Sequence, residues 1–218
     1  MLPSQTSVDD PVLHALEAAG EALAFDRDHV IFTEGEPSDR LYFIQSGKVK
    51  ITRQASHDKK HMLALFGPSN IFGEVSLYDP KPRGCTATAV TEVHLLSLDR
   101  PMLRHWIAHD PNFSEGLLRA LARRLRDTHS TVIDSMTNDA RGRLAKVLIE
   151  LAMRFGSRGV NGWWVTHDLK QVELAQLVGA TRETVNKVLN DFADRGLLRL
   201  VDRGVVILDP ERLARRAN

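Results

Sequence analysis

Cysteine is almost absent from the sequence, since Cys85 is the only one among 218 residues. One thiol excludes a disulfide framework, and it excludes a four-cysteine zinc site or iron–sulfur cluster within the chain. No apolar run approaches the roughly 20 residues that a membrane-spanning helix requires, so we expect no membrane partner. The first residues lack a basic segment followed by an apolar one, so we expect no signal peptide and a cytoplasmic location.

The sequence also lacks a clear excess of either sign of charge, because its net charge is only +1. Its distribution is uneven. From Asn138 onward there are 14 Lys and Arg against 10 Asp and Glu, an excess of 4, whereas the preceding residues have 15 against 18. The C-terminal third is therefore suited to face a polyanion such as nucleic acid, although an imbalance of this size is also common without one.

Short apolar or alternating segments recur between about residues 23 and 98, at intervals of roughly ten residues. They are LYFIQ, KVKIT, MLALF, TATAV and VHLLSL. This spacing predicts a compact all-β unit, and the helical spacing of residues 12–23 predicts a short helix before it.

A long helix is predicted over residues 113–136, after a shorter one over 102–109. Alternating steps of three and four residues relate Leu118, Leu121, Leu125, Thr128, Val132 and Ser135. That spacing is typical of a coiled-coil seam, so we expect the helix to pair with its copy in a dimer. The alternative is a helix packed on its own domain. Residues 137–139 are types that cap and break helices, and they predict a bend.

The C-terminal third contains the pattern of a helix-turn-helix. A helix over 141–155 and a Gly-rich break over 156–162 precede two short helices with apolar residues at helical spacing. Gly179 lies in the turn between them, where a positive φ favours glycine, and Thr181 is a good N-cap for the second helix. Residues 197–208 predict a β-hairpin, the wing of a winged helix.

The second of these helices begins with side chains suited to DNA bases. Arg182 and Lys187 can donate to guanine, and Glu183 can accept from cytosine. All three lie within about one and a half turns, so they share one face with Asn186. The alternative is a solvated face with an ion pair between Glu183 and Lys187.

A second group of polar residues lies inside the β-unit. Backbone N–H groups near Gly73 are suited to hold an anion, and Glu74 is suited to accept hydrogen bonds from a hydroxyl. Arg83 follows nine residues later, and a guanidinium in apolar surroundings needs a carboxylate or a phosphate. A structural ion pair of Arg83 with Glu74 or Asp79 is the alternative.

These motifs carry a family resemblance. AQLVGATRETVNKVL followed by FADRGLL resembles the helix-turn-helix of the cyclic-AMP receptor protein/FNR (CRP/FNR) family of bacterial transcription regulators, and FGEVSLYDPKPRGCTATAV resembles its phosphate-binding cassette. The resemblance covers nearly the whole chain and implies an α+β fold. Its parts are an N-terminal β-roll of the cyclic-nucleotide-binding type over 1–110, a dimerisation helix over 111–137 and a winged helix-turn-helix over 138–218.

The resemblance implies cyclic AMP as the effector. Glu74 would take the ribose 2′-hydroxyl, Arg83 the cyclic phosphate, and Thr128 and His129 of the partner subunit the adenine. The expected effector-binding residues are Gly73, Glu74, Val75, Arg83, Gly84, Thr128 and His129. Gly84 stands where the family has Ser or Thr, and His129 where it has Ser or Asn, so another cyclic nucleotide or anionic ligand is an alternative effector.

The resemblance also implies a dimeric regulator that binds double-stranded DNA at a palindrome with TGTGA-type half-sites, with RNA polymerase as a further partner. The expected DNA-binding residues are Lys170, Thr181, Arg182, Glu183, Asn186 and Lys187. Lys170 stands where the family often has a capping Thr, so Asp168 is the expected cap of the first helix. One alternative is a regulator without an effector. Another is an enzyme or signalling module, which the sequence disfavours because it shows no nucleophile–base pair, metal-ligand set or P-loop.

Overall fold

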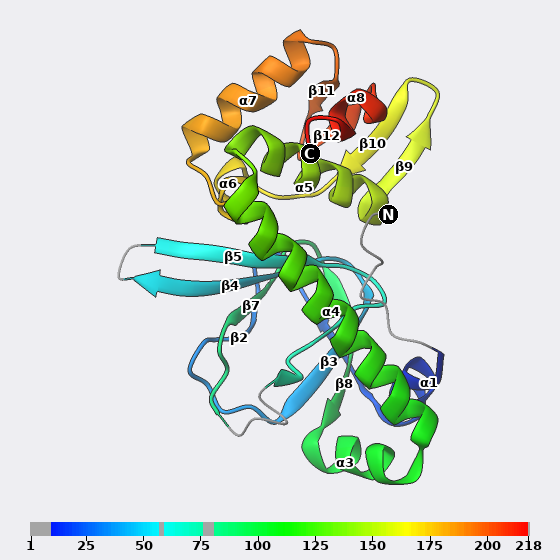
Figure 1. Ribbon diagram of the computed structural model, residues 1–218. Coiled ribbons are helices and arrows are strands. Elements are labelled where there is room, and N and C mark those ends of the chain that lie inside the picture. The colour runs from blue at the N-terminus through cyan, green and yellow to red at the C-terminus, as the bar shows by residue number, and fades with distance from the viewer. Residues whose placement is uncertain (1–9, 57–58, 76–80, 218) are drawn as a thin grey trace. The chain divides into compact units, whose positions relative to one another are not determined.

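Residues 10–56, 59–75 and 81–217 are described by a computed structural model (Figure 1). They divide into two units, residues 10–127 and residues 128–217. The division falls inside a single helix, α4 (Pro111–Thr137). The predicted domain limits of 1–110, 111–137 and 138–218 stay a prediction.

Within the described part of the first unit, residues 21–99 form two antiparallel sheets of four strands each, which confirms the predicted β-unit. One has the order β1 (Glu21–Phe25), β8 (Val93–Asp99), β3 (Arg40–Ser46), β6 (Ile71–Phe72), and the other the order β2 (Val30–Phe32), β7 (Thr86–Ala89), β4 (Val49–Ser56), β5 (Lys59–Phe66). Aromatic and β-branched side chains from both sheets, among them Phe32, Tyr42 and Phe72, are buried in one cluster.

The N-terminal helix is shorter than predicted. Helix α1 spans Asp10–Ala19, and the expectation that it continues to residue 23 is wrong, because Glu21–Phe25 pairs with β8 as an antiparallel strand. Gly20 marks the change. A Cβ at this position would lie 2.3 Å from the carbonyl oxygen of Leu16, so a side chain does not fit there.

Helices α3 (Arg100–His109) and α4 follow the sheets. Phe113, Leu117 and Ala120 of α4 are buried in a second cluster together with residues of α1 and β3, and Leu121 packs against it. On this face, α4 therefore packs on its own domain, which was the alternative to pairing with the same helix of a second chain. An exposed stripe remains on α4, with members at alternating steps of four and three: Leu118, Ala122, Leu125, His129, Val132 and Met136.

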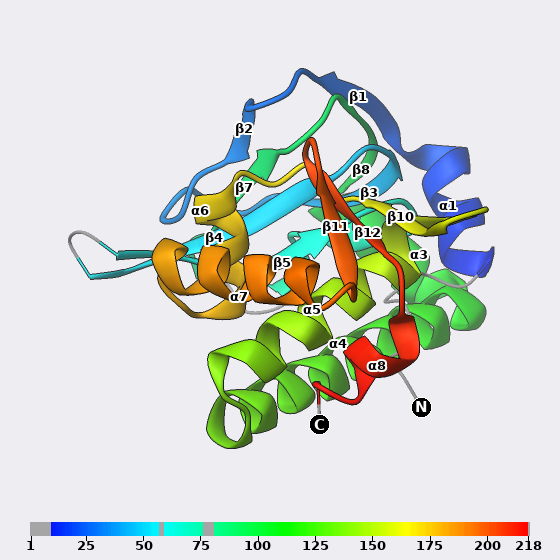
Figure 2. The ribbon, with the colours of Figure 1, turned by 90° about the horizontal axis from the view of Figure 1, so that it is seen from above.

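The second unit contains the predicted winged helix. Its elements are α5 (Ala140–Phe155), β9 (Gly156–Gly159), β10 (Gly162–Thr166), α6 (Gln171–Val178), α7 (Arg182–Asp194), β11 (Leu198–Val201), β12 (Gly204–Ile207) and α8 (Pro210–Ala214). The hairpin β11–β12 lies against α7, and both can be followed in Figure 2. The prediction of a mere Gly-rich break over 156–162 is incomplete, because these residues form most of the hairpin β9–β10, which extends the wing sheet.

Helix ends in this unit follow the predicted capping chemistry. Asp139 caps α5 by accepting from the Gly142 N–H at 2.8 Å, and Thr181 caps α7 by accepting from the Thr184 N–H at 3.2 Å. Gly179 closes α6 with φ of 69°, as expected for the turn. The prediction of Asp168 as the cap of α6 is wrong, since the N-cap position is Lys170, whose N–H donates to the Glu173 carboxylate at 2.8 Å.

None of the helices within the described ranges combines the length and apolarity that crossing a bilayer requires.

Candidate effector site and nucleic-acid interface

Arg83 is a buried cation held by backbone carbonyls. Only 3% of the residue is exposed, and its two terminal nitrogens donate to the Gly73 carbonyl at 2.7 Å and the Arg40 carbonyl at 2.8 Å. The guanidinium carbon lies 4.2 Å from the centre of the Phe32 ring. Burial lowers the pKa of Arg83. Its Nε is buried without a hydrogen-bond partner in the described part of the chain.

Glu74 is equally buried, with 1% of its surface exposed, and its carboxylate forms an ion pair with Arg124 of α4. Arg124 also donates to the Ile71 carbonyl and lies over the Phe66 ring at 4.7 Å. The second carboxylate oxygen of Glu74 is buried and has no hydrogen-bond partner among the described residues. A buried acceptor without a donor costs free energy, so a hydroxyl of a ligand would be favourable there.

Sequence reasoning missed Arg124. A signal for it exists, because position 124 follows Leu117 by seven residues and Ala120 by four, which places it on the buried face of α4. A cation on such a face needs an anionic partner. Its partner is 50 residues away in the sequence, so spacing alone does not identify Glu74.

The alternative of a structural ion pair between Arg83 and Glu74 is not what the structure shows, since Arg83 donates to carbonyls and Glu74 is paired with Arg124. Asp79, the other partner considered for Arg83, lies outside the described residues.

The neighbouring predicted residues differ in how closely they approach Arg83. Gly73 has φ of 84°, and a Cβ there would lie 2.8 Å from a terminal nitrogen of Arg83, so glycine is required for the close approach. A Cβ on Gly84 would meet open space, and Val75 is exposed. Cys85 is half-buried, and burial raises the pKa of its thiol, so it is mostly protonated at neutral pH.

Thr128 and His129 are both exposed on α4, in the second unit. Their predicted role at the effector of a partner subunit stays a prediction.

The predicted base-reading residues gather at the start of α7. Arg182, Glu183 and Lys187 are exposed, as is the cap residue Thr181, while the side chains that point inward from α7 are buried: Val185, Val188, Leu189 and Phe192. Asn186 is half-buried, and its side-chain oxygen has no hydrogen-bond partner within the described residues.

Glu183 is not paired with Lys187 in the described structure, in contrast to the solvated-face alternative. Its pKa is lowered, first by a hydrogen bond from its own backbone N–H and then by the Thr181 hydroxyl. The carboxylate therefore stays ionised at neutral pH and is available as an acceptor. Lys170 is exposed at the start of α6.

Comparisons with known proteins identify both parts of the chain. Residues 22–110 match the family of cyclic nucleotide-binding domains, and residues 142–216 match the Crp-like helix-turn-helix domain. A CRP-like cAMP-activated global transcriptional regulator of Mycobacterium tuberculosis is 53% identical over 210 residues, which cover 96% of this chain and 94% of that protein.

The chain belongs to the CRP/FNR family of transcription regulators. The cyclic AMP receptor protein of Thermus thermophilus is 35% identical over 78% of this CRP-like chain and 76% of its own length. The crystal structure of a CRP-family transcriptional regulator from the same species has a TM-score of 0.77 at 30% identity, covering 89% of this chain and 96% of that one. This CRP-like regulator therefore combines a cyclic nucleotide-binding domain with a DNA-binding helix-turn-helix domain.

Among the described residues, His, Cys, Asp and Glu side chains do not form any group of three or more that could hold a metal ion.

Proposed function

We propose that this CRP-like regulator is controlled by cyclic AMP, or a related small anionic effector, bound beside Glu74 and Arg83. The observation that carries the proposal is a pair of buried ionic groups that each keep one polar atom without a partner in the described chain. Buried polar atoms are normally satisfied, and buried ionic groups concentrate at functional sites, so this pair supports an effector site here.

Each atom has a natural counterpart in a cyclic nucleotide. The Nε–H of Arg83 would donate to a phosphate oxygen, and the free carboxylate oxygen of Glu74 would accept from the ribose 2′-hydroxyl. Because Gly73 and Arg40 already hold the Arg83 guanidinium, little side-chain entropy is lost on binding. The names of the relatives from M. tuberculosis and T. thermophilus also refer to cyclic AMP, and this supports the same effector here.

We propose further that the active form is a homodimer joined along the exposed stripe of α4. Leu118, Leu125 and Val132 are 65%, 57% and 46% exposed, and a partner helix would remove them from water. In such a dimer, Thr128 and His129 of one subunit would contact the effector of the other.

The DNA target that we propose is a palindrome with TGTGA-type half-sites. The start of α7 would enter the major groove, with Arg182 and Lys187 donating to guanine and Glu183 accepting from cytosine. Lys170 and Thr181 would contact phosphates, and the half-buried Asn186 would support this end of the helix. The effector acts through its differential affinity for the DNA-competent state, and RNA polymerase is the partner through which transcription changes.

Isothermal titration of the full-length protein with cyclic AMP and cyclic GMP tests the effector assignment. We expect saturable binding of cyclic AMP and tighter binding of a TGTGA palindrome, measured by fluorescence anisotropy, when cyclic AMP is present. Arg83→Gln removes the fixed cation, and one charge-assisted hydrogen bond is worth about 1.5–3 kcal/mol, so binding should weaken roughly 10- to 150-fold.

Gly84→Ser is the matched variant, because a Cβ there meets open space and the added hydroxyl can reach a phosphate. It should bind cyclic AMP about as tightly as the natural chain or more tightly. Equal binding by Arg83→Gln and the natural chain would overturn the assignment of this pocket, and a preference for cyclic GMP would replace cyclic AMP as the effector.

A further inference from the structure

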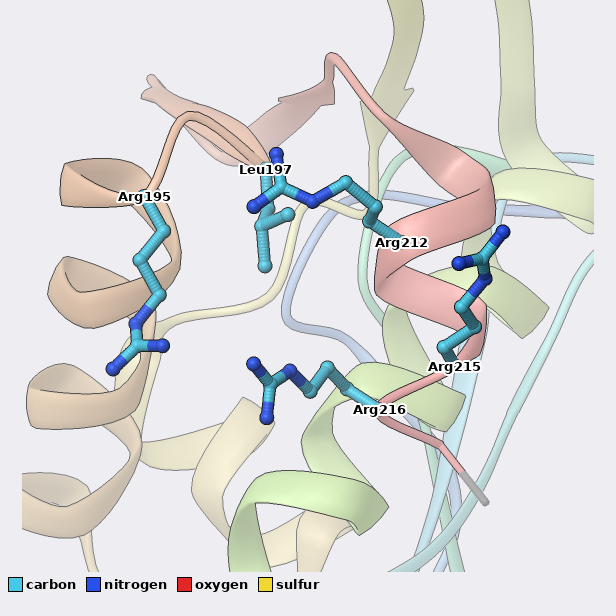
Figure 3. Close-up of a pocket in the computed structure, with 5 residues that line it drawn as sticks. All are labelled: Arg195, Leu197, Arg212, Arg215 and Arg216. Carbon is cyan, nitrogen blue, oxygen red and sulfur yellow. The ribbon is translucent and has the colours of Figure 1, made fainter.

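A cluster of arginines surrounds a cavity of about 260 Å³ in the second unit (Figure 3). Its lining residues are Arg195, Leu197, Arg212, Arg215 and Arg216. Arg195 follows the last turn of α7, and the other three arginines lie on α8 or directly after it. The guanidinium groups of Arg212 and Arg216 extend toward the space between these two segments, whereas that of Arg195 runs alongside α7 and that of Arg215 points away from the space. The cations of Arg195, Arg212 and Arg216 lie on the cavity side and repel one another, so the arrangement favours an anion.

Nearby carboxylates do not neutralise this charge. Asp191 is shared between two arginines, because one oxygen lies 2.9 Å from the Arg195 Nε and the other 2.6 Å from a terminal nitrogen of Arg141. Asp209 lies 3.8 Å from the Arg212 guanidinium, while its other oxygen caps α8 by accepting from the Arg212 N–H at 2.9 Å. Arg215 and Arg216 have no ion pair within the described part of the chain. The cavity therefore keeps a net positive charge.

The backbone that carries the cluster is held in place. The Leu197 N–H donates to Phe192 at 2.9 Å, and the Leu197 carbonyl accepts from Leu208 at 2.9 Å, so the wall after α7 is fixed to the wing. On the other side, the side chain of Asn138 donates to the Ala217 carbonyl at 3.2 Å. An anion here would contact a preformed site whose C-terminal wall is tied to the junction of α4 and α5.

Size and geometry indicate which anion fits. A water molecule occupies about 30 Å³ in the liquid, so a cavity of about 260 Å³ has room for a phosphate or pyrophosphate group. Planar guanidinium forks match phosphate oxygens in pairs, and arginine binds phosphate in this way more specifically than lysine does.

We propose that Arg195, Arg212 and Arg216 form a second anion site that binds a phosphate or pyrophosphate group. The group belongs either to a free phosphorylated molecule or to a DNA backbone. Arg195 follows Arg182 by 13 residues, so at 1.5 Å per residue the site lies about 20 Å along α7 from the base-reading end. A DNA phosphate here would therefore belong to a segment other than the one that α7 reads.

Isothermal titration with sodium pyrophosphate tests the site in the full-length protein, in chloride buffer with saturating cyclic AMP so that the pocket at Arg83 is occupied. We expect saturable binding that the double variant Arg212→Gln, Arg216→Gln weakens at least tenfold. The matched control is Arg158→Gln, Arg199→Gln, which removes two exposed cations of the same unit outside the cavity and should bind pyrophosphate like the natural chain. Circular dichroism checks that both double variants are folded.

The source of the phosphate follows from DNA binding measured against salt concentration. If DNA supplies it, the Arg212 and Arg216 double variant should lower the slope of log affinity against log salt by up to about 2, since each phosphate contact contributes roughly 0.9. If a free molecule supplies it, the slope stays unchanged while pyrophosphate binding is lost. No saturable pyrophosphate binding together with an unchanged slope overturns the proposal. Binding of a polyglutamate peptide in place of pyrophosphate also overturns it, in favour of an acidic protein segment.

Discussion

Glu74 and Arg124 form an ion pair of unequal burial, with 1% and 22% of the side chains exposed. The carboxylate depends on this cation, because a charge removed from water is tolerated only when it is paired. The pair also connects the loop that holds the predicted effector to helix α4. One residue contact thus couples the candidate site to the element that we propose as the dimer interface.

Arg124→Met should therefore destabilise the protein, by about 3–5 kcal/mol, because it leaves the buried Glu74 carboxylate without its cation. The double variant Glu74→Gln, Arg124→Met should recover part of this loss, since no buried charge remains. Urea unfolding followed by circular dichroism measures both. Equal stability of the single and double variants would contradict the account.

Arg182→Ala is a change at the proposed DNA interface alone. Arg182 is exposed, so the fold should be unaffected, and the loss of a forked contact to guanine should cost about 1–3 kcal/mol at one base pair. Binding to a set of palindromes, each altered at one position, measures the effect. The contact is refuted if the variant keeps the base preferences of the natural chain.

Single residues also define how far sequence reasoning reaches. Glu74 and Arg83 stand within one short segment beside Gly73, so the sequence singles them out as candidates, but spacing leaves a structural ion pair open and only the family resemblance assigns them to an effector. Arg124 was missed because its contact joins distant segments. The arginine cluster was missed for the same reason, since Arg195 and Arg216 line the same cavity only after α7, the wing and α8 have folded.

At the scale of elements, local signals predicted the helices and strands that depend on neighbouring residues. The turn at Gly179 and the cap at Thr181 follow from local backbone chemistry and are confirmed. The hairpin β9–β10 was not predicted, because its Gly-rich strand β9 forms only by pairing with β10, which itself pairs with β12. Tertiary pairing outweighed a low intrinsic strand propensity there.

Helix α7 is connected to α5 by an acid-dependent contact. Hydrogen bonding from Arg195, followed by the charge of Arg141, lowers the pKa of Asp191. A carboxyl whose pKa is lowered on folding stabilises the folded state above its unfolded pKa of about 3.9, and this contribution is lost as the pH falls through the lowered value.

Asp191→Asn should therefore melt at a lower temperature than the natural chain at pH 7, and the difference should shrink as the pH falls below about 4. Thermal unfolding by circular dichroism between pH 3 and pH 7 measures this. Asp202→Asn, a change on the turn between β11 and β12, is the control. A melting difference that is constant over the whole range would show that the ionised carboxylate contributes nothing.

At the scale of the whole molecule, the exposed stripe of α4 is the feature that one chain leaves unexplained. The helix has 27 residues, and one face of its first half is buried in the first unit. Leu125 and Val132 lie exposed to water on another face. Periodicity predicted three members of the stripe, Leu118, Leu125 and Val132, whereas it gave Leu121, Thr128 and Ser135 in place of the other three. It did not separate Leu121, which packs on the own core, from its exposed neighbours, because a step of three or four residues allows either face.

Val132→Asp should dissociate the proposed dimer, because two aspartates would face each other across a dry seam. Thr131→Asp places the same charge at an exposed position of α4 outside the stripe, and it should stay dimeric. Sedimentation velocity with saturating cyclic AMP distinguishes the two. A dimeric Val132→Asp protein would place the interface elsewhere.

Because α4 begins in one unit and ends in the other, its number of residues matters as much as their identity. An α-helix turns by about 100° and advances by 1.5 Å per residue. Inserting or deleting one residue near Asp127 would rotate everything downstream by that angle and split the stripe into two misaligned halves. Related chains should consequently keep the length of this helix even where its exposed residues outside the stripe differ.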